Sequence, residues 1–170
     1  MNSPNHNRIF LLTLFTLLFN TNHLFAEDYH VGPSEPLESI GEVPWTTLLP
    51  GDRVYIHWRE TPYFEKWVIN RKGTAEEPIE IIGVNGPEGQ QPIIDGNGAV
   101  TVPIVDYWNE SRGVIKIGGS SIPEDDLPEH IILFNLEIKS ARPGYSFTND
   151  HDETEGYSSN AAAVYIEKGA

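Results

Sequence analysis

Oxygen-bearing side chains are concentrated in the stretch NDHDETEG, which runs from Asn149 to Gly156. A hard cation such as Ca²⁺ takes six to eight oxygen ligands, and closely spaced carboxylates can supply several of them. The candidate metal ligands are Asp150, Asp152, Glu153 and Glu155. The spacing is not that of an EF-hand, because the sixth position of such a loop would not be Gly and the twelfth would not be Glu. The alternative interpretation is a solvated run of charge.

Aromatic side chains are the second set with a chemical use, because sugar rings stack on the apolar faces of Trp and Tyr while their polar ends stay wet. The chain has 4 Trp and 7 Tyr, and we expect most of them in the core. Trp108 and Tyr145 lie in polar stretches and are expected to be exposed. They are the candidate carbohydrate-binding residues.

Familiar catalytic motifs are missing from the sequence. The chain has no Cys, so neither disulfides nor thiolate chemistry can support its function. No nucleophile elbow, phosphate-binding loop, dinucleotide fingerprint or zinc-ligand spacing occurs. Asp125 and Asp126 are adjacent carboxylates, but nothing in the sequence sets them about 5–9 Å apart across a groove, as glycoside hydrolysis requires. The catalytic residues are therefore unknown from the sequence.

The charge of the chain limits its partners. The 170 residues carry 25 Asp and Glu against 11 Lys and Arg. Such an acidic chain repels phosphate backbones and anionic lipid surfaces, so we expect no nucleic-acid partner and no binding to a membrane surface. Long-range attraction favours cations, and calcium is the cofactor to test first.

The N-terminus has the pattern of a secretory signal peptide over residues 1–26. Arg8 precedes an apolar run, Ile9–Phe19, and a small residue, Ala26, follows a short polar stretch. The run is too short to span a bilayer comfortably, so we expect cleavage after Ala26, no stable membrane insertion afterwards, and a secreted, periplasmic or extracellular product. An uncleaved N-terminal anchor is the alternative.

The rest of the chain predicts β-structure. Residues 27–50 are rich in Pro and Gly and are expected to form a leader or cap. After them, short apolar segments alternate with loops that carry Gly, Pro, Asn or Asp, and no segment has a helical apolar period. These segments are VYIHW, EKWVI, PIEII, QPIID, GVIKIGG, HIILFNLEIKSA and AAAVYIE.

The spacing of these segments favours stacked repeats, in which each unit buries the apolar face of its neighbour. In this interpretation PIEII and QPIID are two strands of one coil, joined by a loop, with isoleucines in a shared core. Asn135 stands between two apolar runs, where a residue that tolerates a left-handed backbone could turn the chain. The sequence therefore predicts an all-β solenoid over residues 51–170. An antiparallel sandwich is the alternative fold.

The ordered set LLPGDRVYI, GTAEEPIEIIG, PIIDGNG, EHIILFNLEIKSA and AAAVYIEKGA resembles the opening coils of secreted right-handed parallel β-helix proteins of the pectate-lyase-like superfamily. The resemblance covers residues 29–170. It implies an N-terminal cap, three parallel sheets, and loops that form a polysaccharide groove on one side. Because AAAVYIEKGA is similar to the start of a coil, the resemblance also implies a fragment with further coils and a C-terminal cap beyond it.

The resemblance implies a carbohydrate-active function, specifically a polysaccharide lyase. In β-helix lyases, calcium or a basic side chain neutralises the uronate, and Arg, Lys, His or Tyr act as base and acid. Lys116, Lys139 and Arg142 have suitable side chains, but none falls in a lyase motif, and a solubilising charge on the outer face of a coil is the better explanation of each. We therefore expect no complete catalytic site in this segment. A non-catalytic glycan-binding or adhesion module is the alternative function.

Overall fold

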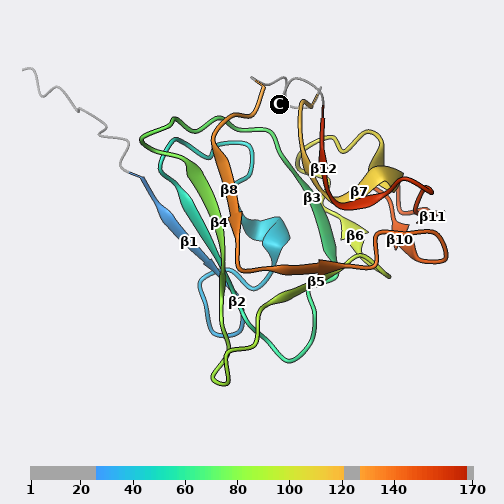
Figure 1. Ribbon diagram of the computed structural model, residues 1–170, viewed down its shortest axis with the longest axis horizontal. Coiled ribbons are helices and arrows are strands. Elements are labelled where there is room, and N and C mark those ends of the chain that lie inside the picture. The colour runs from blue at the N-terminus through green and yellow to red at the C-terminus, as the bar shows by residue number, and fades with distance from the viewer. Residues whose placement is uncertain (1–25, 121–126, 168–170) are drawn as a thin grey trace, which may run out of the picture.

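The computed structural model describes residues 26–120 and 127–167. This part of the chain is mostly β-structure, with two short 3₁₀ turns and no α-helix (Figure 1). No helix within it is long and apolar enough to cross a membrane. The predicted signal peptide lies almost entirely outside the described residues. The strands are β1 (Asp28–Val31), β2 (Arg53–His57), β3 (Glu65–Ile69), β4 (Ile79–Val84), β5 (Ile93–Asp95), β6 (Val100–Thr101), β7 (Gly113–Ile117), β8 (Ile131–Phe134), β9 (Glu137–Lys139), β10 (Ser146–Thr148), β11 (Thr154–Gly156) and β12 (Ala162–Ile166).

One sheet has the order β1-β2-β4-β8, and all of its strands are parallel. Burial alternates along β2 and β4, so one face of the sheet enters the core and the other meets water. Val54 pairs with Ile81, and both are fully buried. On the outer face Arg53 Nε donates to Glu80 Oε2 over 2.9 Å. The strands predicted in VYIHW and PIEII are β2 and β4, and Ile79 and Ile81 lie in the core as expected.

Asn135 makes the corner between β8 and β9. Its φ is 58°, in the left-handed region, as the sequence predicted. Its Nδ2 donates to the Gly83 carbonyl over 2.8 Å and to Asn85 Oδ1 over 2.6 Å. A Cβ at Gly83 would lie 1.9 Å from the Asn135 carbonyl oxygen, so only glycine permits this approach. The corner leads β9 into a two-stranded parallel sheet with β5.

The remaining sheet has the order β11-β10-β6-β3-β7-β12. The two halves of β3 pair with different strands: Glu65 and Lys66 pair with β6, whereas Trp67, Val68 and Ile69 pair with β7. Further along, β10 pairs with β6 and β12 pairs with β7. The chain therefore leaves this sheet twice at the same place, once between β6 and β7 and once between β10 and β12. These two excursions, residues 102–112 and 149–161, lie at one end of Figure 1, and the second contains β11, which returns to the sheet by pairing antiparallel with β10.

The core lies between the sheets and is covered in part by the leader. Trp45 is fully buried, its indole Nε1 donates to the Ile40 carbonyl over 2.8 Å, and its ring lies 5.6 Å from that of Trp67. Leu48, from the same segment, is also fully buried. Residues 27–50 thus pack onto the core with their apolar side chains. The boundaries drawn at residues 26 and 50 stay predictions.

Every apolar segment expected to be a strand contains one. The parallel pairing of β4 with β8 also excludes the antiparallel sandwich, in which PIEII and HIILF would run in opposite directions. Four strands were not predicted, β1, β6, β10 and β11, because none exceeds 4 residues and such lengths carry little periodicity.

Candidate functional site

The two excursions from the β3 sheet enclose a pocket of about 340 Å³. Residues 106–111 form one wall, and Asn149, Asp150, His151 and Glu155 form the other. The lining is mainly carboxylate, amide and aromatic. Because both walls leave the sheet at the same place, the sheet register sets their relative position.

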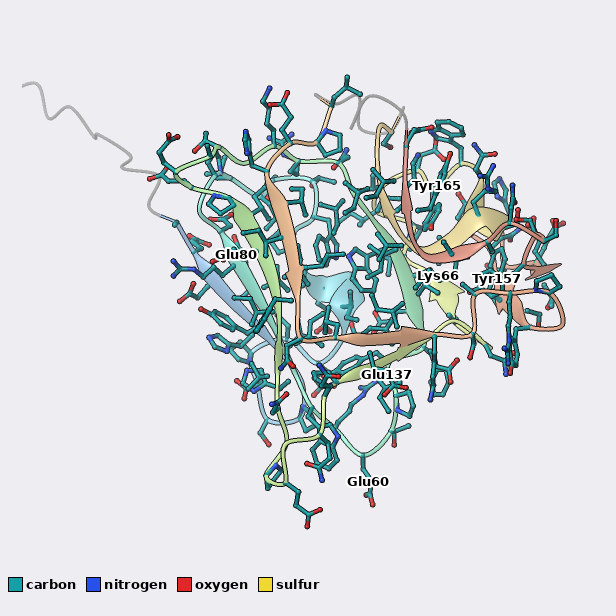
Figure 2. The ribbon with its side chains drawn as sticks, viewed as in Figure 1. Glu60, Lys66, Glu80, Glu137, Tyr157 and Tyr165 are labelled. Carbon is teal, nitrogen blue, oxygen red and sulfur yellow. The ribbon has the colours of Figure 1, made fainter. Side chains whose placement is uncertain are left out.

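Lys66 anchors the first wall from below. Its side chain is fully buried, and its Nζ donates to the Glu110 carbonyl over 2.7 Å. Three aromatic rings surround the amine, with centres 3.3 Å (Phe147), 4.6 Å (Tyr157) and 5.2 Å (Tyr107) from Nζ. Figure 2 shows Lys66 and Tyr157 at this end of the molecule. Burial lowers the pKa of Lys66 to about 7, against the opposing effect of Glu110 and Glu155.

The Glu110 carboxylate links the two walls. It accepts hydrogen bonds from the Thr101 hydroxyl and, over 3.3 Å, from the Asp150 backbone N–H. Burial raises the pKa of Glu110 above its usual value, and the Asp150 carboxylate acts in the same direction, while the two hydrogen bonds act against it. Glu110 is thus a carboxyl group able to hold a proton beside a second carboxylate.

Asn149 folds the second wall. Its Oδ1 accepts from the backbone N–H groups of His151 and Glu153 over 3.0 and 2.8 Å, and its Nδ2 donates to Glu155 Oε1 over 2.9 Å. His151 Nδ1 lies 2.5 Å from Asp150 Oδ1. That contact raises the pKa of His151. Side-chain hydrogen bonds to the backbone therefore give this acidic loop a defined shape.

The four candidate calcium ligands are only partly brought together. Asp150 and Glu155 line the pocket, whereas Asp152 and Glu153 are exposed on the loop and do not line it. Within residues 26–120 and 127–167, a different set has the geometry of a three-residue metal group: His30, Glu35 and His57. Calcium binding by the acidic loop stays a prediction.

The two candidate carbohydrate-binding aromatics lie in different places. Trp108 is 44% exposed, as expected, and belongs to the pocket wall. Tyr145 is partly buried, accepts a hydrogen bond from Arg142 over 3.1 Å, and lines a separate depression with Ala161–Ala163. Only Trp108 can act together with the carboxylates of the pocket.

The basic residues considered for lyase chemistry have structural partners. Lys116 is fully buried, donates to the Gly119 carbonyl over 2.6 Å, and lies 4.1 Å from the centre of the Trp108 ring. It also pairs with Glu167 at 3.4 Å. Lys139 lies 3.7 Å from Asp95 and 3.9 Å from Glu137. Lys116 therefore supports Trp108 from beneath rather than facing a ligand.

Sequence reasoning missed Lys66, Glu110 and the two histidines. The only sequence signal for Lys66 was its place as a charged residue inside the strand segment EKWVI, which neighbouring strands cover on both sides. Glu110 carried no signal, because its partners Lys66 and Asp150 lie 44 and 40 positions away.

Comparison of the chain with protein-family models, curated proteins and solved structures finds no match. The functional argument therefore depends on the residues and their geometry.

Proposed function

We propose that this chain is the N-terminal part of an exported right-handed parallel β-helix protein of the pectate-lyase-like kind that engages polysaccharide. The parallel sheets, the tight corner at Asn135 and the packing of residues 27–50 on the core support this architecture. The pocket between the two excursions is the proposed glycan-contacting site.

The observation that carries the proposal is the exposed ring of Trp108 on a pocket lined by carboxylates and amides. A sugar ring stacks on such an aromatic face, and its hydroxyls donate to carboxylate and amide oxygens. Lys116 beneath the Trp108 ring and Lys66 beneath the Glu110 backbone hold the wall in place before the ligand arrives. A preorganised wall reduces the entropy lost on binding.

The charge of the pocket sets the ligand class. Asp106, Glu110, Asp150 and Glu155 line it, so an unassisted uronate would be repelled. Hydroxyl-rich neutral glycans fit directly, whereas acidic polysaccharides require a bridging cation such as calcium. We therefore expect binding of pectate or alginate to depend on calcium, and binding of neutral glycans to be independent of it.

The binding test is isothermal titration of the full chain with neutral and acidic oligosaccharides, with and without calcium. We expect Trp108→Ala to weaken binding about tenfold, which corresponds to about 1.4 kcal/mol for one stacked ring. Phe134→Ala is the matched control, because Phe134 is 63% exposed on β8 and lies outside the pocket. Equal affinity of the parent chain and Trp108→Ala would contradict the proposal.

Polysaccharide cleavage is the second candidate function. The observation in its favour is Glu110, whose pKa is raised by burial beside Asp150, because cleavage needs a group that protonates the leaving oxygen. An assay of unsaturated-uronate absorbance on pectate, alginate and glycosaminoglycans separates the two functions. Binding without absorbance change supports a glycan-binding module. Turnover that disappears in Glu110→Gln supports an enzyme.

A further inference from the structure

Two histidines and a glutamate meet at the end of the first sheet, away from the pocket. His30 lies in β1, His57 ends the neighbouring parallel strand β2, and Glu35 belongs to the turn that follows β1. That turn is closed by two backbone hydrogen bonds, Gly32 N–H to Leu37 O at 2.8 Å and Leu37 N–H to His30 O at 3.1 Å. Two paired strands and a hydrogen-bonded turn thus hold the three residues.

The three side chains lie close together. His30 Nδ1 lies 2.9 Å from His57 Nε2, and His57 Nδ1 lies 3.3 Å from Glu35 Oε1. One ligand atom from each residue can be chosen so that all three lie within 4.8 Å of one another. The His57 and Glu35 side chains are 25% and 29% exposed, so an ion can reach them from solvent.

Neighbouring residues fix this arrangement. The His30 ring stacks on Tyr55, with centres 4.7 Å apart and planes 13° apart. The Tyr63 hydroxyl donates to the His57 carbonyl over 2.7 Å. Gly32, with φ of 151°, brings the turn so close that a Cβ there would lie 2.8 Å from His57 Cβ. Side-chain orientation is therefore determined before any ligand binds, as metal sites require.

We propose that His30, His57 and Glu35 bind one divalent transition metal ion, with Zn²⁺ the best fit. Two imidazole nitrogens and one carboxylate oxygen form a ligand set that Zn²⁺ uses with a water molecule in the fourth position. In a tetrahedral site with Zn–N distances of about 2.05 Å the two nitrogens lie about 3.3 Å apart. The present contacts use opposite nitrogens of the His57 ring, Nε2 toward His30 and Nδ1 toward Glu35, so the His57 ring must turn to offer one nitrogen to an ion that all three side chains share. This site is independent of the glycan pocket and goes beyond the function proposed for it.

The same distances have a competing explanation without a metal: Glu35 and His30 each make a hydrogen bond with the His57 ring. The test is titration of the metal-free full chain with ZnCl₂ by calorimetry, together with ring ¹H–¹⁵N spectra of the histidines. We expect one Zn²⁺ per chain and shifts of the His30 and His57 ring signals. His30→Asn and Glu35→Gln should each weaken binding at least about tenfold.

The matched control is His130→Asn, which removes an exposed histidine beside the Glu129 carboxylate, outside both the glycan pocket and the proposed metal site, and should leave the affinity unchanged. Glu35→Gln keeps the shape and hydrogen-bonding capacity of the side chain, so its effect does not depend on whether His30→Asn folds. The proposal is overturned if the parent chain binds no Zn²⁺, if Glu35→Gln binds as tightly as the parent, or if His130→Asn loses as much affinity as the two site variants.

Discussion

The ammonium nitrogen of Lys66 lies 3.3 Å from the centre of the Phe147 ring. The two residues come from β3 and β10, and the contact belongs to the aromatic enclosure beneath the pocket. A cation against ring faces recovers part of the hydration that burial removes. The enclosure thus ties the Glu110 backbone to the sheet through a side chain whose protonation depends on pH.

We predict that Lys66 makes the stability of the protein rise with pH above neutrality. The pKa of Lys66 is lowered to about 7 by burial, whereas an unfolded lysine titrates near 10.4. Between these values the unfolded chain binds more protons than the folded one, so the free energy of unfolding increases with pH. From pH 7 to pH 9 the parent chain should gain about 2 kcal/mol relative to Lys66→Met, measured by urea unfolding.

Lys139→Met is the control for this measurement, because the Lys139 side chain is 40% exposed and its amine stays in contact with water. Its stability should follow that of the parent chain with pH. Parallel stability curves for the parent and Lys66→Met would show that the Lys66 amine is not desolvated in the folded protein.

A second prediction concerns the corner at Asn135. Asn135→Ala loses the side-chain bonds to Gly83 and Asn85 and places a strained residue at φ of 58°. The left-handed backbone costs an L-residue such as Ala about 1–2 kcal/mol, and each lost hydrogen bond costs about 0.5–1.5 kcal/mol. Asn135→Gly loses the bonds but accepts the backbone, so urea unfolding should rank the parent above Asn135→Gly and Asn135→Gly above Asn135→Ala. An Ala variant as stable as the Gly variant would contradict the role of the left-handed backbone.

A third prediction tests the geometry of the acidic loop. The Asp150 carboxylate raises the pKa of His151 first through their hydrogen bond and then through its charge. Asp150→Asn should therefore move the titration midpoint of the His151 ring, followed by NMR, down toward about 6.5. Asp152→Asn removes the same charge from an exposed neighbour and should move the midpoint much less. Equal shifts in the two variants would mean that the loop has no defined Asp150–His151 contact.

The features that could be predicted from the sequence are those that a short stretch of residues determines by itself. Short apolar segments between turn residues identified β2 and β4, and the conformational tolerance of Asn identified the corner at Asn135. The pocket could not be predicted in the same way, because it exists only where two excursions distant in sequence leave one sheet together. Trp108 was expected to be exposed from its polar neighbours. The pKa of Glu110, by contrast, is raised first by burial and then by the Asp150 carboxylate, and both depend on the register of the sheet.

The register of the first sheet also bears on how such a protein can diversify. Arg53 and Glu80 meet across β2 and β4 from positions 27 apart, whereas Gly83 and Asn135 meet across the next interval from positions 52 apart. The pairs β2–β4 and β4–β8 are both parallel, although the chain between the contacting residues is nearly twice as long in the second pair. Insertions and deletions can therefore accumulate in the segments that connect the strands without disturbing the strands themselves. A longer loop could reshape the pocket between the excursions while the strands keep the same core.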